Sequence, residues 1–357
     1  MTASNWFTVV IIPTYVRPVK RIQRRRGRLV KTAGVVAGCV LVLTGGGAAW
    51  AYWHLDHNIR GVDIDSALGD DRPPKRAPAT PEPSATAPPV GALNILVLGS
   101  DSRSGRKNSA LGGGHSEGAR SDTAMVVHLA AGRSSATVVS IPRDTLVERP
   151  ACPASSGGTT QAAYGAMFNS AYSVGGPVCA VKTVEKLTGV RMDHYLEIDF
   201  SGFASVVDAL GGVDVTTTED IDDDLSHLQL DAGYHHLDGK QALAFARTRH
   251  GVGDGSDLGR IKLQQQLVKA LVEKVSESDL LTNPARLYKV ADALTGSLTT
   301  DTGLDSLGEL QALAGSLKGL SADEVKTVMM PVLPAPSDPN RVVANEPEAG
   351  KLWASLR

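Results

Sequence analysis

From residue 93 onward, apolar and polar positions follow two distinct patterns. Short continuous apolar runs bounded by turn residues are typical of buried strands, whereas apolar residues recurring every three to four positions are typical of helices. Strands are expected at residues 93–100, 123–130, 136–141, 194–200, 213–217 and 325–331. Helices are expected at residues 162–172, 178–187, 203–210, 239–246, 257–276, 284–294, 304–317 and 346–356. Strands interleaved with helices predict an α/β sandwich with a largely buried central sheet.

Residues 32–53 form a 22-residue stretch without a formal charge. At about 1.5 Å per residue, a helix of this length can cross the hydrocarbon core of a membrane. Eight basic residues precede it within residues 1–31, and Trp50, Tyr52 and Trp53 stand at its other end. This arrangement predicts one transmembrane helix in the cell membrane, with a cytoplasmic N-terminus and the rest of the chain outside. A cleaved signal peptide is the alternative, which the length of the apolar run disfavours.

A proline-rich segment follows this stretch. Residues 72–89 contain seven prolines among Ala, Thr and Ser, and such a composition cannot bury a core. A short extended patch, a possible edge strand, precedes it near residues 59–64. The expected organisation is a cytoplasmic basic tail (1–31), a transmembrane anchor (32–53), an extracellular linker that acts as an extended tether (54–92) and a folded domain (93–357).

Charge and cysteine content narrow the class of protein. Residues 1–31 hold eight of the 36 Lys and Arg and none of the 38 Asp and Glu, so residues 32–357 carry a formal net charge of −10. This balance argues against a basic nucleic-acid-binding surface on the folded domain. Cys152 and Cys179 lie in the part expected outside the cell, where an oxidising environment favours a disulfide between them over two reduced thiols.

Four polar clusters stand at the expected ends of strands or helices. Three of them place an aspartate near an arginine: Asp101 with Arg103, Asp122 with Arg120, and Asp144 with Arg143. Each pair alone is more often a surface ion pair than a binding site. Their repetition at element ends is less easily explained in this way, because open α/β sheets bind ligands at the carboxyl ends of their strands.

The fourth cluster, residues 245–260 (FARTRHGVGDGSDLGR), contains three arginines. If this segment is extended, Arg247 and Arg249 point in the same direction. Arg260 lies in the first turn of the expected helix 257–276, where a cation opposes the helix dipole. An anion bound at that helix N-terminus would offset this cost, and guanidinium groups bind phosphate oxygens in a bidentate manner. With Asp101 and Asp122 as candidate Mg²⁺ ligands beside substrate phosphates, the pattern predicts a pyrophosphate site.

One face of the expected helix 257–276 begins polar and becomes apolar. Arg260, Gln264, Leu267 and Leu271 lie on it, at helical spacing. An ordinary core face with a polar end explains this stripe from periodicity alone. The alternative is a phosphate head group at the polar end with a lipid tail along the apolar end.

Nine sequence segments resemble the LytR–CpsA–Psr family. In order, from about residue 93 to 266, they are NILVLGSDSR, RSDTAMVVHL, VVSIPRDT, FNSAYSVGG, TVEKLTG, DHYLEIDFSGF, VDALGGV, LDGKQALAFARTRH and GDGSDLGRIKLQQQ. The resemblance implies an extracytoplasmic transferase that moves a glycopolymer from a polyprenyl-pyrophosphate carrier to peptidoglycan, forming a phosphodiester and releasing polyprenyl phosphate. It also implies that residues 93–357 are the catalytic domain, an α-β-α sandwich with a central mixed sheet and a hydrophobic lipid tunnel.

The same resemblance assigns roles to individual residues. Asp101 and Asp122 resemble ligands of Mg²⁺ (or Mn²⁺). The residues resembling the pyrophosphate-binding and catalytic arginines are Arg120, Arg143, Arg247, Arg249 and Arg260. Asp257 resembles an acidic position that serves either as a helix cap or as a base. Further substrate contacts are expected from Arg103, Gln264, Leu267 and Leu271. The implied partners are the lipid-linked glycan donor, peptidoglycan and the membrane, with no nucleic acid.

Two other functions remain open at this point. A membrane-bound transcription regulator would need a cytoplasmic DNA-binding domain, but only about 31 residues are expected there, fewer than a usual domain contains. A lipid pyrophosphatase would use the same phosphate-binding residues, with water in place of the sugar hydroxyl. The sequence therefore does not separate transfer from hydrolysis.

Overall fold

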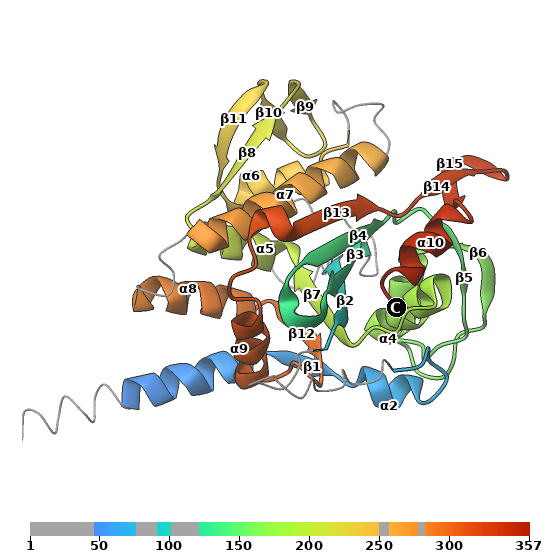
Figure 1. The fold of residues 1–357 in the computed structure, drawn as a ribbon, viewed down its shortest axis with the longest axis horizontal. Coiled ribbons are helices and arrows are strands. Elements are labelled where there is room, and N and C mark those ends of the chain that lie inside the picture. The colour runs from blue at the N-terminus through green and yellow to red at the C-terminus, as the bar shows by residue number, and fades with distance from the viewer. Residues whose placement is uncertain (1–45, 76–90, 101–120, 250–256, 278–282) are drawn as a thin grey trace, which may run out of the picture. The chain divides into compact units, whose positions relative to one another are not determined.

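The computed structural model describes residues 46–75, 91–100, 121–249, 257–277 and 283–357. Within them, a seven-stranded sheet has the order β1-β12-β7-β2-β3-β4-β13 (Figure 1). Its strands are β1 (Arg60–Val62), β2 (Leu93–Ser100), β3 (Ser121–Leu129), β4 (Ala136–Ile141), β7 (His194–Asp199), β12 (Leu298–Asp301) and β13 (Val325–Met329). Because β2 is parallel to β7 and antiparallel to β3, the central sheet is mixed, as expected.

Helices pack on both faces of this sheet (Figure 1). One face is covered by α2 (Ile64–Leu68), α4 (Asn169–Thr188) and α10 (Glu348–Ala354). On the other side lie α5 (Phe200–Ala209), α6 (Gly239–Arg247), α7 (Asp257–Glu277), α8 (Pro284–Thr295) and α9 (Leu307–Ser316). The α/β sandwich predicted from the sequence is therefore confirmed.

The alternation of side chains along the central strands separates the two faces. Leu96 of β2 belongs to one core cluster, together with Val184 of α4 and Trp353 of α10. Its neighbour Ile95 belongs to a second cluster, against which Val268 of α7 packs. The same strand thus contributes to two separate cores, one on each face.

Four short strands form an outer layer beyond the α7 face. They are β8 (Val213–Thr217), β9 (Ile221–Asp223), β10 (Leu228–Leu230) and β11 (Gly233–Leu237). β8 pairs with β11 and β9 pairs with β10, both antiparallel. Their apolar side chains form a third core cluster with α6 and α7, which includes Val215, Phe245 and Leu263. This cluster fixes α6 and α7 against each other.

The segment between β4 and β7 differs from the expectation. The predicted helix 162–172 is wrong over most of its length, since β6 (Ala163–Met167) is a strand paired with β5 (Leu146–Arg149), and only residues 169–172 are helical. Gly165 has a φ of 64°, a conformation that interrupts a helix and that glycine adopts without strain. The predicted helix 178–187 belongs to α4, which begins at Asn169 and has non-helical dihedrals at Gly175 and Gly176.

Two further features complete the fold. The expected disulfide between Cys152 and Cys179 is present, with a Cα–Cα distance of 5.4 Å. It joins the loop after β5 to α4. A hairpin of β14 (Val332–Ala335) and β15 (Asp338–Ala344) precedes α10, and Val342 of β15 forms a bridge with Thr145 after β4.

The proline-rich segment does not separate the folded part from what precedes it. β1 lies before this segment and pairs with β12 at the edge of the central sheet. Arg72, at its start, has a side chain only 1% exposed and forms an ion pair of 2.7 Å with Glu185 of α4. The expected tether is therefore an internal connection, because residues on both sides of it belong to the same fold.

The predicted transmembrane segment 32–53 lies mainly outside the described residues. No helix in the described part of the chain is both long and apolar enough to span a bilayer.

Candidate active site

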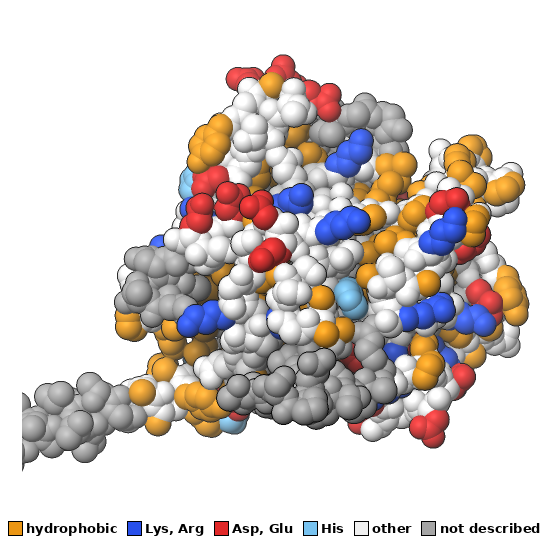
Figure 2. Space-filling view, in the orientation of Figure 1, with side chains coloured by type: hydrophobic (Ala, Val, Ile, Leu, Met, Phe, Trp, Pro, Cys, Tyr) orange, Lys and Arg blue, Asp and Glu red, His pale blue; other side chains and the backbone are white. Residues whose placement is uncertain are grey.

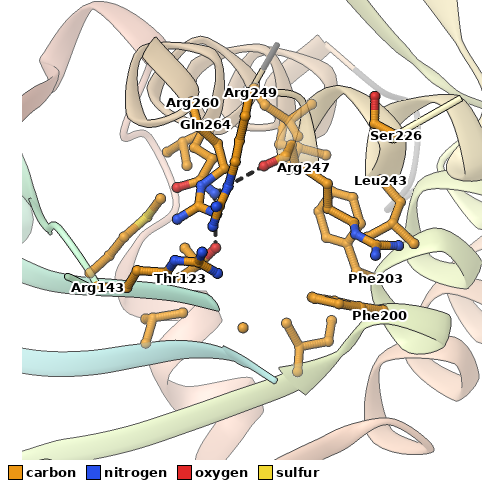
Figure 3. A pocket seen from close by; sticks show the side chains of 18 of the residues that line it. Thr123, Arg143, Phe200, Phe203, Ser226, Leu243, Arg247, Arg249, Arg260 and Gln264 are labelled. Carbon is orange, nitrogen blue, oxygen red and sulfur yellow. Dashed lines mark hydrogen bonds between the residues drawn. The ribbon is translucent and has the colours of Figure 1, made fainter. Parts of the chain in front are cut away.

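A cavity of about 490 Å³ lies between the central sheet and the helices α5, α6 and α7 (Figure 3). Its floor is formed by the ends of neighbouring strands, where Gly99 of β2 and Thr123 of β3 are paired. A Cβ at position 99 would lie 3.2 Å from the Thr123 Cβ. Glycine therefore keeps the two strand ends close and leaves space above them.

The cavity brings together four of the arginines predicted from the sequence. Arg143 follows β4, Arg247 ends α6, Arg249 lies two residues later, and Arg260 belongs to the first turn of α7. Arg260 is only 4% exposed, so its charge is held inside the protein. Figure 3 shows Arg143, Arg249 and Arg260 gathered on one side, while Arg247 points toward the opposite wall.

Arg247 lies against an aromatic side chain on that wall. Its guanidinium carbon is 5.0 Å from the centroid of the Phe200 ring, within the range of a cation–π contact. Phe200 is the first residue of α5, whose start is fixed by Asp199. The Asp199 carboxylate accepts a hydrogen bond of 2.8 Å from the Gly202 N–H. The end of β7 thus places an aromatic ring at the edge of the arginine cluster.

Arg249 directly follows Thr248, the C-terminal cap of α6, and a hydrogen bond of its backbone N–H fixes its position. Thr248 is fully buried, and its hydroxyl donates to the Ala244 carbonyl at 2.9 Å. Asp223 of β9 accepts a hydrogen bond of 2.8 Å from the Arg249 N–H. Thr248 is turned into the protein, and Arg247 and Arg249 on either side of it both line the cavity. They do not point in the same direction, as an extended segment would require, because Arg247 is the last residue of α6 (Figure 3).

Gln264 connects the helix of Arg260 to the neighbouring elements. Its Nε2 donates to the Thr123 hydroxyl at 2.9 Å and to the Ala246 carbonyl at 3.0 Å (Figure 3). One amide group therefore links α7 to β3 and to α6. Gln264 was expected beside the arginines, and it lies there.

Arg143 is held in a loop braced by the C-terminal hairpin. Its Nε is 3.7 Å from Asp144 Oδ2, and Asp144 Oδ1 is 3.2 Å from Nη1 of Arg341 on β15. The Arg143 carbonyl accepts a hydrogen bond of 3.1 Å from the Asn169 N–H at the start of α4. This loop is therefore fixed by contacts from two distant parts of the chain.

The remaining walls are mostly apolar. They are formed by Val97, Met125, Ile198, Phe200, Phe203, Leu225, Leu243, Ala246, Leu267, Val268 and Leu271. Leu267 and Leu271 were predicted as substrate contacts, and both line the cavity. A cavity with guanidinium groups at one part and apolar side chains over the rest suits a ligand with an anionic head and an apolar body.

Five predicted site residues fall wholly or partly outside the described structure. Asp101, Arg103 and Arg120 lie outside the described residues, as do the side chains of Asp122 and Asp257. The backbone shows that Asp122 occupies an irregular position of β3. Gly99 pairs with Thr123 and Ser100 with Ser121, so Asp122 is the extra residue of a β-bulge.

Other residues of the site were not expected from the sequence. Thr123, Phe200, Phe203 and Asp223 all line the cavity. The Asp222–Asp224 run is visible in the sequence, but nothing local distinguishes its middle residue. The role of Asp223 depends on a contact with a segment 26 residues later, which only the folded chain reveals.

The fold is mixed α/β, and its cavity has guanidinium groups at one part and apolar walls over the rest. Over residues 52–357, the sequence matches the model of the LytR_cpsA_psr family, and the chain belongs to this family.

Individual relatives agree with this assignment. The chain is 34% identical over 338 residues to the probable cell wall biosynthesis protein LcpB of Corynebacterium glutamicum, covering 93% of this chain and 72% of LcpB. It is 35% identical over 269 residues to the cell wall biosynthesis protein LcpA of the same organism, covering 68% of this chain but only 50% of LcpA.

A third relative has a crystal structure. Over 238 residues, the chain is 32% identical to TagV of Bacillus subtilis, named a polyisoprenyl-teichoic acid–peptidoglycan teichoic acid transferase, and the match covers 65% of this chain and 57% of TagV. The TagV crystal structure superposes with a TM-score of 0.57 and 28% identity, covering 74% of this chain and 96% of that one. The two proteins therefore share the mixed α/β fold.

Proposed function

We propose that this chain is an extracytoplasmic transferase that moves a glycopolymer from a polyprenyl-pyrophosphate carrier to peptidoglycan. The observation that carries this proposal is the cavity that combines four arginines, one of them buried, with apolar walls. A pyrophosphate would occupy the arginine end, and the polyprenyl chain would lie along the apolar walls as in a tunnel. The name of TagV supports a wall glycopolymer as the group transferred, and the names of LcpA and LcpB support a role in cell wall biosynthesis.

In the proposed reaction, a hydroxyl oxygen of a peptidoglycan sugar attacks the phosphorus that bears the glycan. A new P–O bond forms, the bond to the bridging oxygen breaks, and that oxygen leaves with polyprenyl phosphate. The hydroxyl proton passes to solvent or to a base, for which Asp257 at the start of α7 is a candidate. Arg143, Arg249 and Arg260 stabilise the phosphate oxygens, whose charge changes during transfer.

A divalent cation fits the chain positions of Asp101 and Asp122. Asp101 directly follows β2, and Asp122 occupies the bulge of the neighbouring strand, beside Gly99 and Thr123 of the cavity floor. Bulges near binding sites commonly change the direction of a side chain. Carboxylate and phosphate oxygens are the ligands that Mg²⁺ prefers. The two aspartates would hold Mg²⁺ or Mn²⁺, which would neutralise part of the pyrophosphate charge.

The proposal places the catalytic part outside the cell membrane. Residues 32–53 would anchor the chain, with residues 1–31 in the cytoplasm, in line with the positive charge before the span. The Cys152–Cys179 disulfide supports this location, because disulfides persist in oxidising compartments.

The test is a transfer assay with a polyprenyl-pyrophosphate-linked glycan, peptidoglycan and MgCl₂. We expect polyprenyl phosphate and a glycan–peptidoglycan phosphodiester to appear together. Arg249→Ala and Arg260→Ala should lower the rate by about 10²–10³-fold, the usual effect of removing one group that stabilises a developing charge. The matched control is Lys262→Ala, which removes an exposed cation from the same helix as Arg260 and should leave the rate unchanged.

Two outcomes would contradict the proposal. Unchanged transfer by Arg249→Ala and Arg260→Ala would remove the arginine cavity from the reaction. Polyprenyl phosphate released equally fast without peptidoglycan, with free glycan phosphate as the other product, would assign hydrolysis instead of transfer.

A further inference from the structure

Asp223 is a buried carboxylate in the wall of a cavity proposed to bind an anion. It ends β9 and is 2% exposed, whereas its neighbours Asp222 and Asp224 are exposed. Figure 2 shows acidic side chains gathered at the outer end of this layer, near β9 and β10. A negative charge in the cavity wall weakens anion binding by simple electrostatics, and burying it costs free energy unless it is well hydrogen-bonded. Its presence there calls for a compensating role.

The hydrogen bonds of Asp223 show what it holds. Its Oδ1 accepts from the N–H groups of Leu225 and Ser226, at 2.9 and 3.3 Å, which closes the turn between β9 and β10. Its Oδ2 accepts from the N–H of Arg249 at 2.8 Å. Hydrogen bonds to a charged acceptor are among the stronger ones in proteins. One carboxylate thus joins the β9–β10 turn to the backbone of a cavity arginine.

A second contact joins the same two segments. The Ser226 and Thr248 hydroxyls are 2.9 Å apart, and Thr248 immediately precedes Arg249. Both Ser226 and Arg249 are among the residues that line the cavity. Two hydrogen bonds, one at Thr248 and one at Arg249, therefore fix the backbone that follows α6.

We propose that Asp223 is a positioning residue for the phosphate site: by holding the Arg249 backbone, it sets the place of the Arg249 guanidinium in the cavity. This inference rests on the proposed function, because it assumes a pyrophosphate ligand. It makes the β9–β10 turn part of the donor site, although this turn contributes no cation. Asp223 is not a ligand of the phosphate, since like charges repel.

The sign of a binding change separates positioning from electrostatics. Asp223→Asn removes a negative charge from an anion site, so electrostatics alone predicts tighter binding of pyrophosphate. Loss of positioning predicts weaker binding, because Asn offers one acceptor oxygen where the carboxylate serves both segments. We expect the dissociation constant for inorganic pyrophosphate, measured by titration calorimetry in MgCl₂, to rise about tenfold.

The controls locate the effect at Arg249. Asp222→Asn and Asp224→Asn remove the same charge from exposed neighbours and should change the dissociation constant by less than about twofold. In an Arg249→Ala background, Asp223→Asn should have little further effect, because a residue that acts through another loses its effect when that residue is absent. Ser226→Ala, a milder change for the case that Asp223→Asn does not fold, should weaken binding about two- to threefold.

The outcomes separate this inference from the proposed function. Failure of the wild-type protein to bind pyrophosphate would contradict the proposed function itself. Wild-type binding with equal or tighter binding by Asp223→Asn would overturn only the positioning role. Equal weakening by Asp223→Asn with and without Arg249 would also overturn it, since Asp223 would then act independently of that arginine.

Discussion

The two faces of the central sheet are built from the same strands, but one face is filled by a core and the other borders a cavity. On the α4 and α10 face, Leu96, Leu98 and Val126 are 0% exposed in a continuous core. On the α7 face, Gly99 and Thr123 at the strand ends border a cavity of about 490 Å³. The alternation of side chains lets one strand fill one face and leave the other partly open.

The difference shows how space for a ligand can be kept in a stable fold. The filled face holds large fully buried side chains, among them Trp353, Phe168 and Tyr195. The open face has small residues at the strand ends and keeps Arg260 buried above them, an arrangement that adds little to stability. The filled face therefore carries much of the stability, and the open face carries the proposed chemistry.

The largest effect expected from this comparison concerns a matched pair of leucines. Leu96→Ala should lower the free energy of unfolding by about 2–5 kcal/mol, because it creates a void in a filled core. Leu271→Ala should lower it by less than about 2 kcal/mol, because Leu271 is only partly buried and already borders open space. Equilibrium unfolding in urea at an unchanged m-value measures both. Equal losses at the two sites would contradict the distinction between the faces.

Enlarging the same two leucines to phenylalanine tests the comparison in the opposite direction, with a smaller expected effect on stability. Leu96→Phe should cost about 1–3 kcal/mol by overpacking, whereas Leu271→Phe should be tolerated because it extends into the cavity. There it should weaken binding of farnesyl pyrophosphate about tenfold, equivalent to about 1.4 kcal/mol, by occupying space for the lipid. Equilibrium unfolding in urea measures the stability of both variants, and titration calorimetry measures the binding of farnesyl pyrophosphate.

Inorganic pyrophosphate is the control ligand for Leu271→Phe, because it has no lipid chain. Its dissociation constant should stay within about twofold of wild type if the apolar walls and the arginines serve different parts of the donor. Similar weakening for both ligands would show instead that the substitution disturbs the arginine end.

Much of the sheet and the long helices could be predicted from the sequence. β2 (Leu93–Ser100) and β4 (Ala136–Ile141) have the expected bounds, and α7 ends one residue later than expected. In these elements, the order of apolar and polar residues along the chain follows the burial of each position. Strands β5, β9, β10, β12 and β14 were not expected, because they have only three or four residues each, too few for a pattern of apolar positions to show. The longer strands β11 and β15 were not expected either.

The site could also be predicted in part from the sequence. Arg247, Arg249 and Arg260 were expected together because they lie in one charged segment, and Arg143 because its motif resembles one of the family. The structure brings all four to one cavity. Asp223 was not expected, because its carboxylate acts on the backbone of a segment 26 residues away. The metal ligands Asp101 and Asp122 remain predictions from the sequence.

The smallest expected effect concerns the outer layer on the open face. There the carboxylate of Asp214 of β8 has polar partners near the surface, whereas the Arg72–Glu185 ion pair of the filled face is buried. Hydrogen bonds from His236 and Tyr234, followed by the charge of Lys274 on α7, lower the pKa of Asp214 to about 2, against the opposing effect of burial. The Asp214 side chain is 37% exposed, so solvent screening limits its contribution to about 0.2–1 kcal/mol.

The pH dependence of that contribution follows from the sign of the shift. A carboxylate whose pKa is lower in the folded state binds fewer protons there, so it stabilises the fold above the ordinary pKa near 4. The contribution is lost as the pH falls from about 4 toward 2. The free energy of unfolding of Asp214→Asn should therefore lie slightly below wild type at pH 5 and approach it at pH 2. Asp222→Asn is the control, and a difference that stays constant from pH 5 to 2 would show that Asp214 acts through shape rather than through its charge.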